Sequence, residues 1–358
     1  AKSTRVRHAA TLADVGRAAG VSVMAASAVL NGAKTSSRIS DETRERILAA
    51  AVQLRYRANA TARALVDRRM NTIGVATTLS RNELNQYFLE VFNGVIEAAA
   101  EAGQNTTVFA LPDWKDGASR IPGICDGRID GLILLAPLLD VEAAKYLPDH
   151  TPIVSVHANN ALPNVVNLES DEETGAFEMV RHMLAQGHRR ILHIAGPTHS
   201  IGAMRRISGY LGAHAAAGVE PAAGYIVNGE YTTWSGFHEL EAWLKRQSGG
   251  ELPQAIFAGS DAIAIGCLDA LAARGYRTPA DISVVGFDDT LLARSAHLAT
   301  VRQPLREMGQ RAVKLLVDRI EAKHQDTSYR VPNNIVLPTE VVLGQSLATP
   351  RGHPLVIS

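Results

Sequence analysis

The spacing of apolar residues changes near residue 70, and this change divides the chain into two parts. Before it, apolar residues recur every three or four positions and predict three short helices over residues 11–19, 22–31 and 40–54. Beyond residue 72, short apolar runs alternate with helical stretches, which is typical of parallel sheets covered on both faces. We therefore expect a small all-α head followed by a larger α/β part. The expected strands are 73–76, 107–110, 131–135, 153–156, 191–195, 255–258 and 282–287, and the expected helices include 88–102, 174–186, 205–217, 235–247 and 262–273.

The first two predicted helices carry the start and stop signals of a helix-turn-helix unit. Thr11 and Asp14 have the spacing of an N-terminal capping box, and Gly20 ends the first helix. Ser22 can cap the second helix, which Asn31 and the following glycine close. Three helices within about 45 residues, with a glycine turn between the first two, fit this class of DNA-binding head.

The charge of the chain is as unevenly distributed as its apolar pattern. Residues 1–70 hold 13 Lys and Arg against 5 Asp and Glu, a net charge of +8, so the remaining 288 residues carry −8 within a formal total of zero. A basic module joined to an acidic remainder is suited to attracting phosphate. A disordered basic arm is the alternative, but the apolar residues of the predicted helices supply a small core.

Length and composition limit the remaining possibilities. With 358 residues, of which 46% are apolar, the chain is expected to form two or three domains. It contains no run of about 18 uncharged apolar residues and no apolar segment after its basic first residues, so we expect neither a membrane span nor a secretion signal, and a cytoplasmic protein. Cys125 and Cys267 each have apolar neighbours, which favours buried reduced thiols over a disulfide.

Polar residues follow several of the predicted strands at their carboxyl ends. Thr78 follows the first strand, His157 the fourth, Ser260 the strand 255–258, and Asp288 the strand 282–287. Ligands of open α/β sheets bind beyond the carboxyl ends of the strands, and two such sheets joined by crossing segments would enclose a cleft. The sequence therefore predicts a ligand site between two lobes.

Motifs for catalysis or for cofactor binding are absent from the sequence. It has no G-x-G-x-x-G after a strand, no phosphate-binding G-x-x-x-x-G-K-[ST] and no G-x-S-x-G. His182, His188 and His193 are too scattered for a zinc site, and no cysteines accompany them. We expect a protein that is not an enzyme and that needs no cofactor or metal.

The motifs of the chain resemble those of the LacI/GalR family of transcriptional regulators from the head almost to the C-terminus. The resemblance implies a helix-turn-helix head and a two-lobed, periplasmic-binding-protein-like effector domain with parallel sheets. It makes residues 22–31 the recognition helix and 59–65 a hinge helix that folds on operator DNA, with Leu65 wedged into the minor groove. The motifs are 12–15, 19–22, 27–32 and 43–47 in the head, and 73–75, 130–133, 187–191, 195–197, 206–209, 281–289 and 301–304 beyond it.

The resemblance also assigns residues to DNA contact. On the second helix, one face would meet the major groove, and its apolar members suit thymine methyl groups; packing within the head is the alternative for Met24. Three positions depart from the family pattern: Ala25 replaces the usual Thr, Ala28 replaces a residue that is often polar or basic, and Ala58 replaces Pro. The DNA-binding candidates are Thr11, Ser22, Val23, Met24, Ser27, Ala28, Asn31, Arg38, Tyr56, Asn59, Ala62, Arg63 and Leu65.

Matching positions in the second part point to a small-molecule effector. Arg206 and Asp288 correspond to a pair that grips ligand hydroxyls, since a guanidinium donates two hydrogen bonds and a carboxylate accepts two. A buried salt bridge is the alternative for Arg206. A sugar or sugar acid is preferred, while nucleobases and other small metabolites remain open; Tyr87 and Phe88 are set aside as core residues. The effector-binding candidates are Thr78, His157, Arg206, Tyr231, Trp234, Ser260 and Asp288.

The implied function is that of an effector-controlled regulator of transcription, expected to be a repressor. Its partners would be double-stranded operator DNA, the effector and a second copy of the chain, because symmetric operators favour a homodimer; inducer and corepressor are both open. A transport-type solute-binding protein is the rival, but it would have no use for residues 11–65. The expected division is head 1–58, hinge helix and linker 59–72, first lobe 73–162 and 296–328, second lobe 163–295 and 329–345, and tail 346–358.

Overall fold

A computed structural model gives the fold of the chain and divides it into two compact units, Ala1–Asn71 and Thr72–Ser358. Each unit is described by itself. The structure describes residues 9–31, 39–57, 69–78, 85–327, 329, 331–352 and 355–357.

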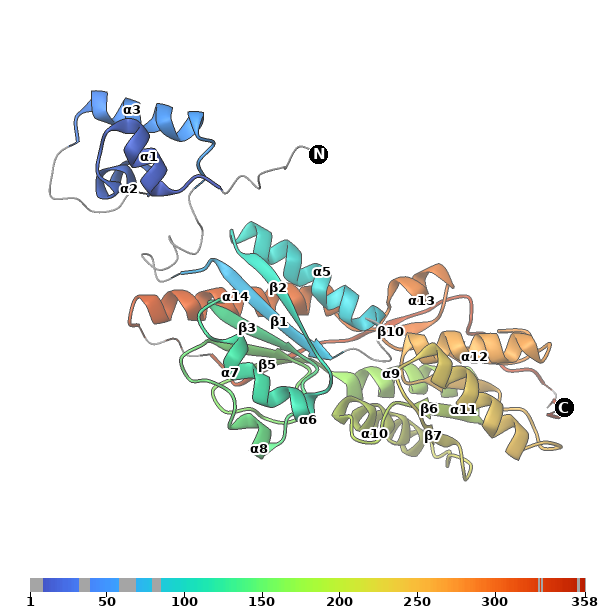
Figure 1. The fold of residues 1–358 in the computed structure, drawn as a ribbon. Coiled ribbons are helices and arrows are strands. Elements are labelled where there is room, and N and C mark those ends of the chain that lie inside the picture. Colours follow the sequence, from blue (N-terminus) through green and yellow to red (C-terminus); the bar gives the residue numbers. More distant parts are fainter. Residues whose placement is uncertain are drawn as a thin grey trace. The chain divides into compact units, whose positions relative to one another are not determined.

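The described part of the first unit forms the expected head of short helices, α1 (Leu12–Ala19), α2 (Val23–Asn31) and α3 (Asp41–Gln53) (Figure 1). The helices enclose a small core around Val15, Ala26 and Ile47. No single helix in the described part of the chain is both long and apolar enough to cross a membrane, and α1 and α2 meet that test only when joined across a bend of 108°.

The first lobe of the second unit is built on a six-stranded parallel sheet in the order β11-β5-β4-β3-β1-β2. Helices α5 and α14 cover one face through an aliphatic core, and α6, α7 and α8 lie on the opposite face (Figure 1). Its strands are β1 (Thr72–Thr78), β2 (Asn105–Leu111), β3 (Gly131–Leu135), β4 (Ile153–Val156), β5 (Val166–Ser170) and β11 (Asn334–Leu337). Its helices are α5 (Gln86–Glu101), α6 (Trp114–Gly117), the 3-10 turn η1 (Ala118–Arg120), α7 (Ile121–Ile124), α8 (Val141–Ala144) and α14 (Leu305–His324).

The second lobe repeats this layering on a four-stranded parallel sheet in the order β7-β6-β8-β9. Helices α9 and α10 pack on one face, and α11 and α12 pack on the other (Figure 1). Its strands are β6 (Ile191–Ala195), β7 (Ile226–Asn228), β8 (Ala255–Ala258) and β9 (Ser283–Val285). Its helices are α9 (Glu172–Ala185), α10 (Ile201–Ala216), α11 (Thr233–Arg246), α12 (Asp261–Ala273) and α13 (Leu291–Ser295).

The chain passes between the lobes after β5, before α14 and after β11. At this crossing β10 (Thr300–Arg302) and β12 (Glu340–Val342) pair as an antiparallel ribbon. The sheet pairing differs from the expected division at two points. Residues 166–170 and 334–337, expected in the second lobe, are strands of the first sheet, because β5 pairs with β4 and β11 pairs with β5.

The C-terminal segment, expected as a separate tail, packs on the second lobe. Ser346 is buried, and its hydroxyl donates to the Val284 carbonyl at 2.6 Å. Ile357 is also buried, in the core between α11, α12 and the sheet, and its N–H donates to the Gly250 carbonyl at 2.8 Å. This segment therefore closes one side of the second lobe.

Candidate functional site

The head has the geometry of a helix-turn-helix. Thr11 and Asp14 form the expected capping box: the Thr11 hydroxyl accepts from the Asp14 N–H at 3.3 Å, and the Asp14 carboxylate accepts from the Thr11 N–H at 3.0 Å. Gly20 ends α1 in the left-handed region at φ 66°, and the Ser22 hydroxyl accepts from the Ala25 N–H at 3.1 Å. The resulting bend of 108° lies within the range of this motif.

The face of α2 assigned to the groove is the outward one. Met24 is 68% exposed and Val23 is 49% exposed, whereas Ala26 on the other face is fully buried. Met24 is not among the residues of the head core, which argues against the alternative that it packs within the head. The candidates differ in exposure: Thr11 and Ser22 are exposed, and Ser27, Ala28, Asn31 and Tyr56 are partly buried. Arg38, Asn59, Ala62, Arg63 and Leu65 lie outside the described residues.

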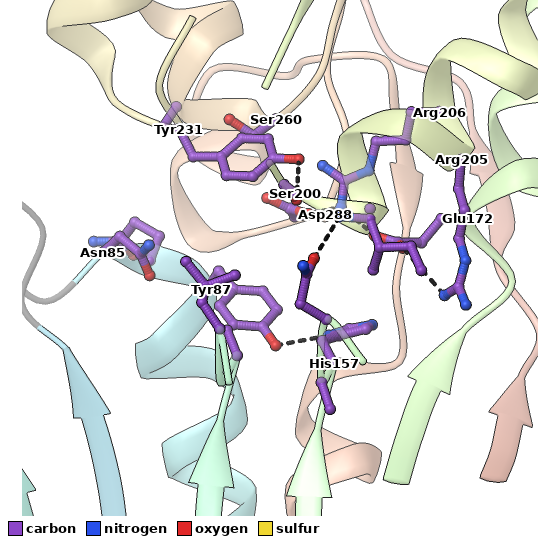
Figure 2. A pocket seen from close by; sticks show the side chains of 18 of the residues that line it. Asn85, Tyr87, His157, Glu172, Ser200, Arg205, Arg206, Tyr231, Ser260 and Asp288 are labelled. Atoms are coloured by element: carbon purple, nitrogen blue, oxygen red, sulfur yellow. Dashed lines mark hydrogen bonds and ion pairs between the residues drawn. The ribbon is translucent and has the colours of Figure 1, made fainter. Parts of the chain in front are cut away.

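The second unit contains a cavity where the carboxyl ends of its two sheets face each other. It encloses about 840 Å³ of empty space, part of which is open to solvent. Ligand pockets for small molecules have this order of volume. Five of the effector candidates line it, namely His157, Arg206, Tyr231, Ser260 and Asp288 (Figure 2).

Arg206, on α10, is the centre of the second-lobe wall. Its Nη2 lies 2.6 Å from Glu172 Oε1 and 4.0 Å from Asp288 Oδ1, and its Nη1 donates to the Gly259 carbonyl. Its guanidinium carbon also lies 5.3 Å from the centroid of the Tyr231 ring. Burial opposes the charged form, but Tyr231, Glu172 and Asp288 raise the pKa of Arg206, which therefore stays charged. Arg206 thus combines the predicted place in the cleft with the buried salt bridge of the alternative interpretation.

Glu172 is a cleft residue that the sequence did not reveal. It is the first residue of α9, directly after the chain leaves the first lobe, and its carboxylate also lies 3.7 Å from Arg205 Nη1. Burial alone would raise the pKa of Glu172, but the attraction of Arg206 outweighs burial and leaves this pKa lowered. A run of acidic residues at a helix start is common, so spacing alone could not show which carboxylate faces inward.

Asp288 follows β9 in an unusual backbone conformation. Its φ of 124° lies in the region that favours glycine, and the conformation is held by its N–H donating to the Val301 carbonyl at 2.8 Å. Gln303 Nε2 donates to Asp288 Oδ1 at 2.5 Å. Burial raises the pKa of Asp288 to about 8, although the charge of Arg206 acts in the opposite direction.

The first-lobe wall is formed by uncharged groups centred on His157 and Tyr87. His157 Nε2 lies 3.1 Å from the Ser170 N–H and 3.0 Å from Ser170 Oγ. On the other side of the ring, His157 Nδ1 and the Tyr87 hydroxyl share a hydrogen bond of 2.6 Å, whose donor is set by the imidazole tautomer (Figure 2). Burial lowers the pKa of His157 and raises that of Tyr87, so both are neutral.

Tyr231 and Ser260 reach the cleft through close local packing. A Cβ on Gly196 would lie 2.2 Å from Tyr231 Cζ, so the ring can approach β6 only because this position is glycine. The Tyr231 hydroxyl lies 3.4 Å from Ser200 Oγ, and burial raises the pKa of Tyr231. Ser260 caps α12 by accepting from the Ile263 N–H at 3.2 Å.

The remaining two effector candidates do not line the cavity. Thr78 is the last residue of β1 and is not among the residues that line the cavity. Trp234 lies on α11, is 49% exposed, and stacks on His238 with ring centroids 4.1 Å apart. Tyr87, set aside in favour of core packing, lines the cavity instead, whereas its neighbour Phe88 is buried in the first-lobe core.

Direct contacts between the lobes flank the cavity. The Ile201 N–H donates to Asn159 Oδ1 at 2.7 Å, and Arg294 Nη2 lies 2.6 Å from Glu90 Oε1. Across the described residues, no group of three or more His, Cys, Asp or Glu side chains could hold a metal ion. The arrangement is suited to binding a small polar molecule between the two lobes.

Comparisons with known proteins agree with both units. Residues 11–59 match the model of bacterial regulatory proteins of the lacI family, and residues 180–347 match a periplasmic binding protein-like domain. The ribose operon repressor of Haemophilus influenzae is 31% identical over 94% of this chain and 98% of its own length. The chain belongs to the lacI family.

Solved structures of the lacI family extend the likeness to the fold. A lac repressor dimer bound to operator and the anti-inducer ONPF has a TM-score of 0.78 at 28% identity, covering 95% of this chain and 99% of that chain. A complex of the transcriptional regulator CelR with cellobiose has a TM-score of 0.68 at 29% identity, covering 94% and 99%. This chain is therefore a DNA-binding transcriptional regulator and not an enzyme or a transport-type binding protein.

Proposed function

We propose that this lacI-family protein is a homodimeric repressor whose affinity for operator DNA is set by a small polyhydroxylated effector in the interlobe cleft. The observation that carries the effector half is the Arg206, Glu172 and Asp288 cluster facing Tyr87 and His157 across one cavity. The DNA half rests on the matched head with its exposed α2 face.

On the DNA side, we infer that α2 reads the major groove. Met24 and Val23 project from its exposed face and suit thymine methyl groups, while Ser27 and Ser22 suit phosphate or base edges. Thr11, Ala28, Asn31 and Tyr56 complete the proposed contacts within the described head, and the proposed contacts outside the described residues are Arg38, Asn59, Ala62, Arg63 and Leu65.

On the effector side, we infer that Arg206, Asp288 and Ser260 bind ligand hydroxyls from one lobe while His157 and Tyr87 bind from the other. Tyr231 would provide a face for a sugar ring to stack on. The ribose operon repressor and the CelR–cellobiose complex support a sugar as the effector class. Thr78 and Trp234, outside the lining, have no part in this proposal.

Two further assignments depend on the relatives and on the partner. The lac repressor dimer on operator supports a homodimer for this chain, which a two-fold symmetric operator would match. Because the proposed partner is chromosomal DNA in a bacterium, we propose that the protein acts in the cytoplasm.

Selection from a pool of random DNA duplexes tests the DNA half. We expect the protein to enrich a site of two related half-sites, and a pool without enrichment would contradict sequence-specific binding. Thermal unfolding against a panel of sugars, sugar acids, polyols and purines tests the effector half, because a ligand of the folded state raises its stability. A stabilising compound must also change the affinity for the selected duplex by about tenfold, corresponding to about 1.4 kcal/mol of coupling.

A further inference from the structure

Glu172 is the counter-ion of Arg206 within the cleft. The two side chains are 4% and 7% exposed, and their Oε1 and Nη2 atoms lie 2.6 Å apart. Arg206 Nη1 donates to the Gly259 carbonyl, and among the described residues Nε is buried without a hydrogen-bond partner. The positive charge of Arg206 is thus already compensated by the protein.

The fold is built to keep this carboxylate in place. Glu172 is at the first position of α9, where the helix N-terminus favours a negative charge. A Cβ on Gly202 would lie 2.6 Å from Glu172 Oε1, so the close approach of α10 to the carboxylate depends on glycine at this position. The pair is therefore part of the lobe rather than a contact between mobile surface chains.

The other groups around the cavity add no excess charge. Arg205 Nη1 lies 2.9 Å from Glu169 Oε2, so its charge is also compensated. Burial raises the pKa of Asp288 to about 8 and lowers that of His157, which favours the neutral form of both side chains. Among the described residues that line it, the cavity offers several hydrogen-bonding groups, and the charges of its two arginines are compensated.

We propose that Glu172 sets the charge selectivity of the cleft, so that it admits uncharged polyhydroxyl ligands and excludes the corresponding carboxylates. This inference rests on the proposed effector site. An anion entering the wild-type cleft would meet the Glu172 carboxylate, and its attraction to Arg206 would be opposed at short range. A ligand that carries only hydroxyl groups meets no such repulsion.

Sulfate binding tests the role of Glu172 without knowledge of the effector. We expect Glu172→Gln to bind sulfate at least about tenfold tighter than the wild type in calorimetric titrations at constant ionic strength, because a charge-assisted hydrogen bond contributes on that scale. Glu173→Gln is the matched control, since Glu173 is the next residue on α9 and contacts Ser208 outside the cavity. The gain must disappear in Glu172→Gln/Arg206→Gln.

Three sulfate results would overturn the proposal. In the first, the wild type binds sulfate tightly and Arg206→Gln abolishes this binding. In the second, Glu172→Gln and Glu173→Gln bind sulfate equally. In the third, the tighter sulfate binding of Glu172→Gln persists after Arg206 is replaced. The last result would mean that the anion binds elsewhere. Circular dichroism establishes that each variant is folded before titration.

Matched pairs of ligands test the selectivity on the intact wild type, which keeps the proposal testable if Glu172→Gln does not fold. D-Glucuronate differs from D-glucose only in having a carboxylate in place of one hydroxymethyl group, and D-galacturonate differs from D-galactose in the same way. We expect any pair that the protein recognises to stabilise it through the neutral member, and stronger stabilisation by the acid would refute the selectivity. If neither pair acts while Glu172→Gln gains sulfate binding, the role of Glu172 stands and the choice of these sugars as effectors fails.

Discussion

The two lobes share one layered α/β plan but differ in what they bury. The polar residues buried in the first lobe are mostly hydroxyl-bearing, such as Thr77, Thr151 and Ser155, with Glu169 as an ionisable exception, whereas the second lobe buries many ionisable groups. The latter are Glu172, His188, His193, Arg206, His214, Asp261, Asp288 and Asp289. The second lobe therefore provides the charged anchor of the cleft, and the first lobe provides a neutral wall that completes it.

This difference also concerns stability, because buried ionisable groups make folding depend on their partners and on pH. Removing one charge from a solvent-exposed ion pair costs little stability. Removing one member of a buried ion pair costs much more, because the other charge stays inside the protein without its partner. The lobes should accordingly respond differently to equivalent substitutions.

The largest expected effect comes from breaking the buried pair. Arg206→Met leaves the buried Glu172 carboxylate with only Arg205, 3.7 Å away, as a counter-ion, and we expect a loss of about 3 kcal/mol in the free energy of unfolding at pH 7. Urea denaturation followed by circular dichroism measures this loss. Because Glu172 can then be protonated, part of the loss should be recovered at lower pH.

A first-lobe pair provides the matched control. Arg306 and Glu97 form an ion pair whose side chains are 55% and 41% exposed, on α14 and α5. Arg306→Met should change stability far less than Arg206→Met, since solvent screens this pair. Equal losses in the two variants would contradict the distinction between the lobes.

The next effect concerns the buried histidine of the second sheet. His193 stacks between Tyr210 and Phe257 with centroid distances of 5.2 and 4.8 Å, and burial lowers its pKa to about 4. The unfolded chain, with an ordinary pKa near 6.5, binds more protons between pH 6.5 and 4. Stability therefore falls with falling pH in this window, by about 2 kcal/mol from pH 7 to pH 5.

The His193→Gln variant isolates this contribution. It should be less stable at pH 7 because its packing is poorer. Between pH 6.5 and 4, however, its free energy of unfolding should fall less steeply with falling pH, and the difference in slope corresponds to about one bound proton. The comparison with the wild type is needed because burial raises the pKa of Asp261 and Asp288, which contribute with the opposite sign. Parallel pH profiles of the two proteins would contradict the assignment.

Local signals in the sequence predicted the parts of the fold that depend on neighbouring residues. The caps of α1 and α2 follow from side chains that bond backbone groups within three positions. The strands 131–135 and 153–156 were found because both are continuous apolar runs. The cleft positions of His157 and Asp288 followed from one rule, that polar residues after parallel strands meet at one edge.

Pairing between distant segments explains most of what the sequence did not reveal. β11 has only four residues and forms a strand by pairing with β5, whose partner residues lie 167 positions earlier in the chain. The α14 helix was not assigned from the pattern, although it covers the first sheet. Glu172 and Tyr87 belong to the cleft because of the relative position of the lobes, which no local spacing encodes.

A smaller effect is expected at the crossing between the lobes. Gln303 Nε2 donates to Asp288 Oδ1 at 2.5 Å, and its Oε1 accepts from the Ser170 hydroxyl, so one buried amide joins groups from both lobes. Gln303→Leu removes both of these hydrogen bonds and should lower stability by about 1.5 kcal/mol in urea denaturation. Gln310→Leu, on the exposed face of α14, is the control, and equal stability of the two variants would refute the bridging role.

The smallest effect tests the neutral wall itself. Tyr87→Phe removes the hydrogen-bond partner of His157 Nδ1 and should cost about 1 kcal/mol of stability, because this buried nitrogen loses its 2.6 Å hydrogen bond. If the hydroxyl hydrogen also serves the ligand, the affinity for an effector found in the thermal panel should fall about fivefold, while sulfate binding stays unchanged because no charge is altered. Tyr146→Phe, at an exposed first-lobe tyrosine, is the control. An altered sulfate affinity in Tyr87→Phe would mean that the first lobe shares in charge selection, and the contrast between a charged anchor and a neutral wall would then be wrong.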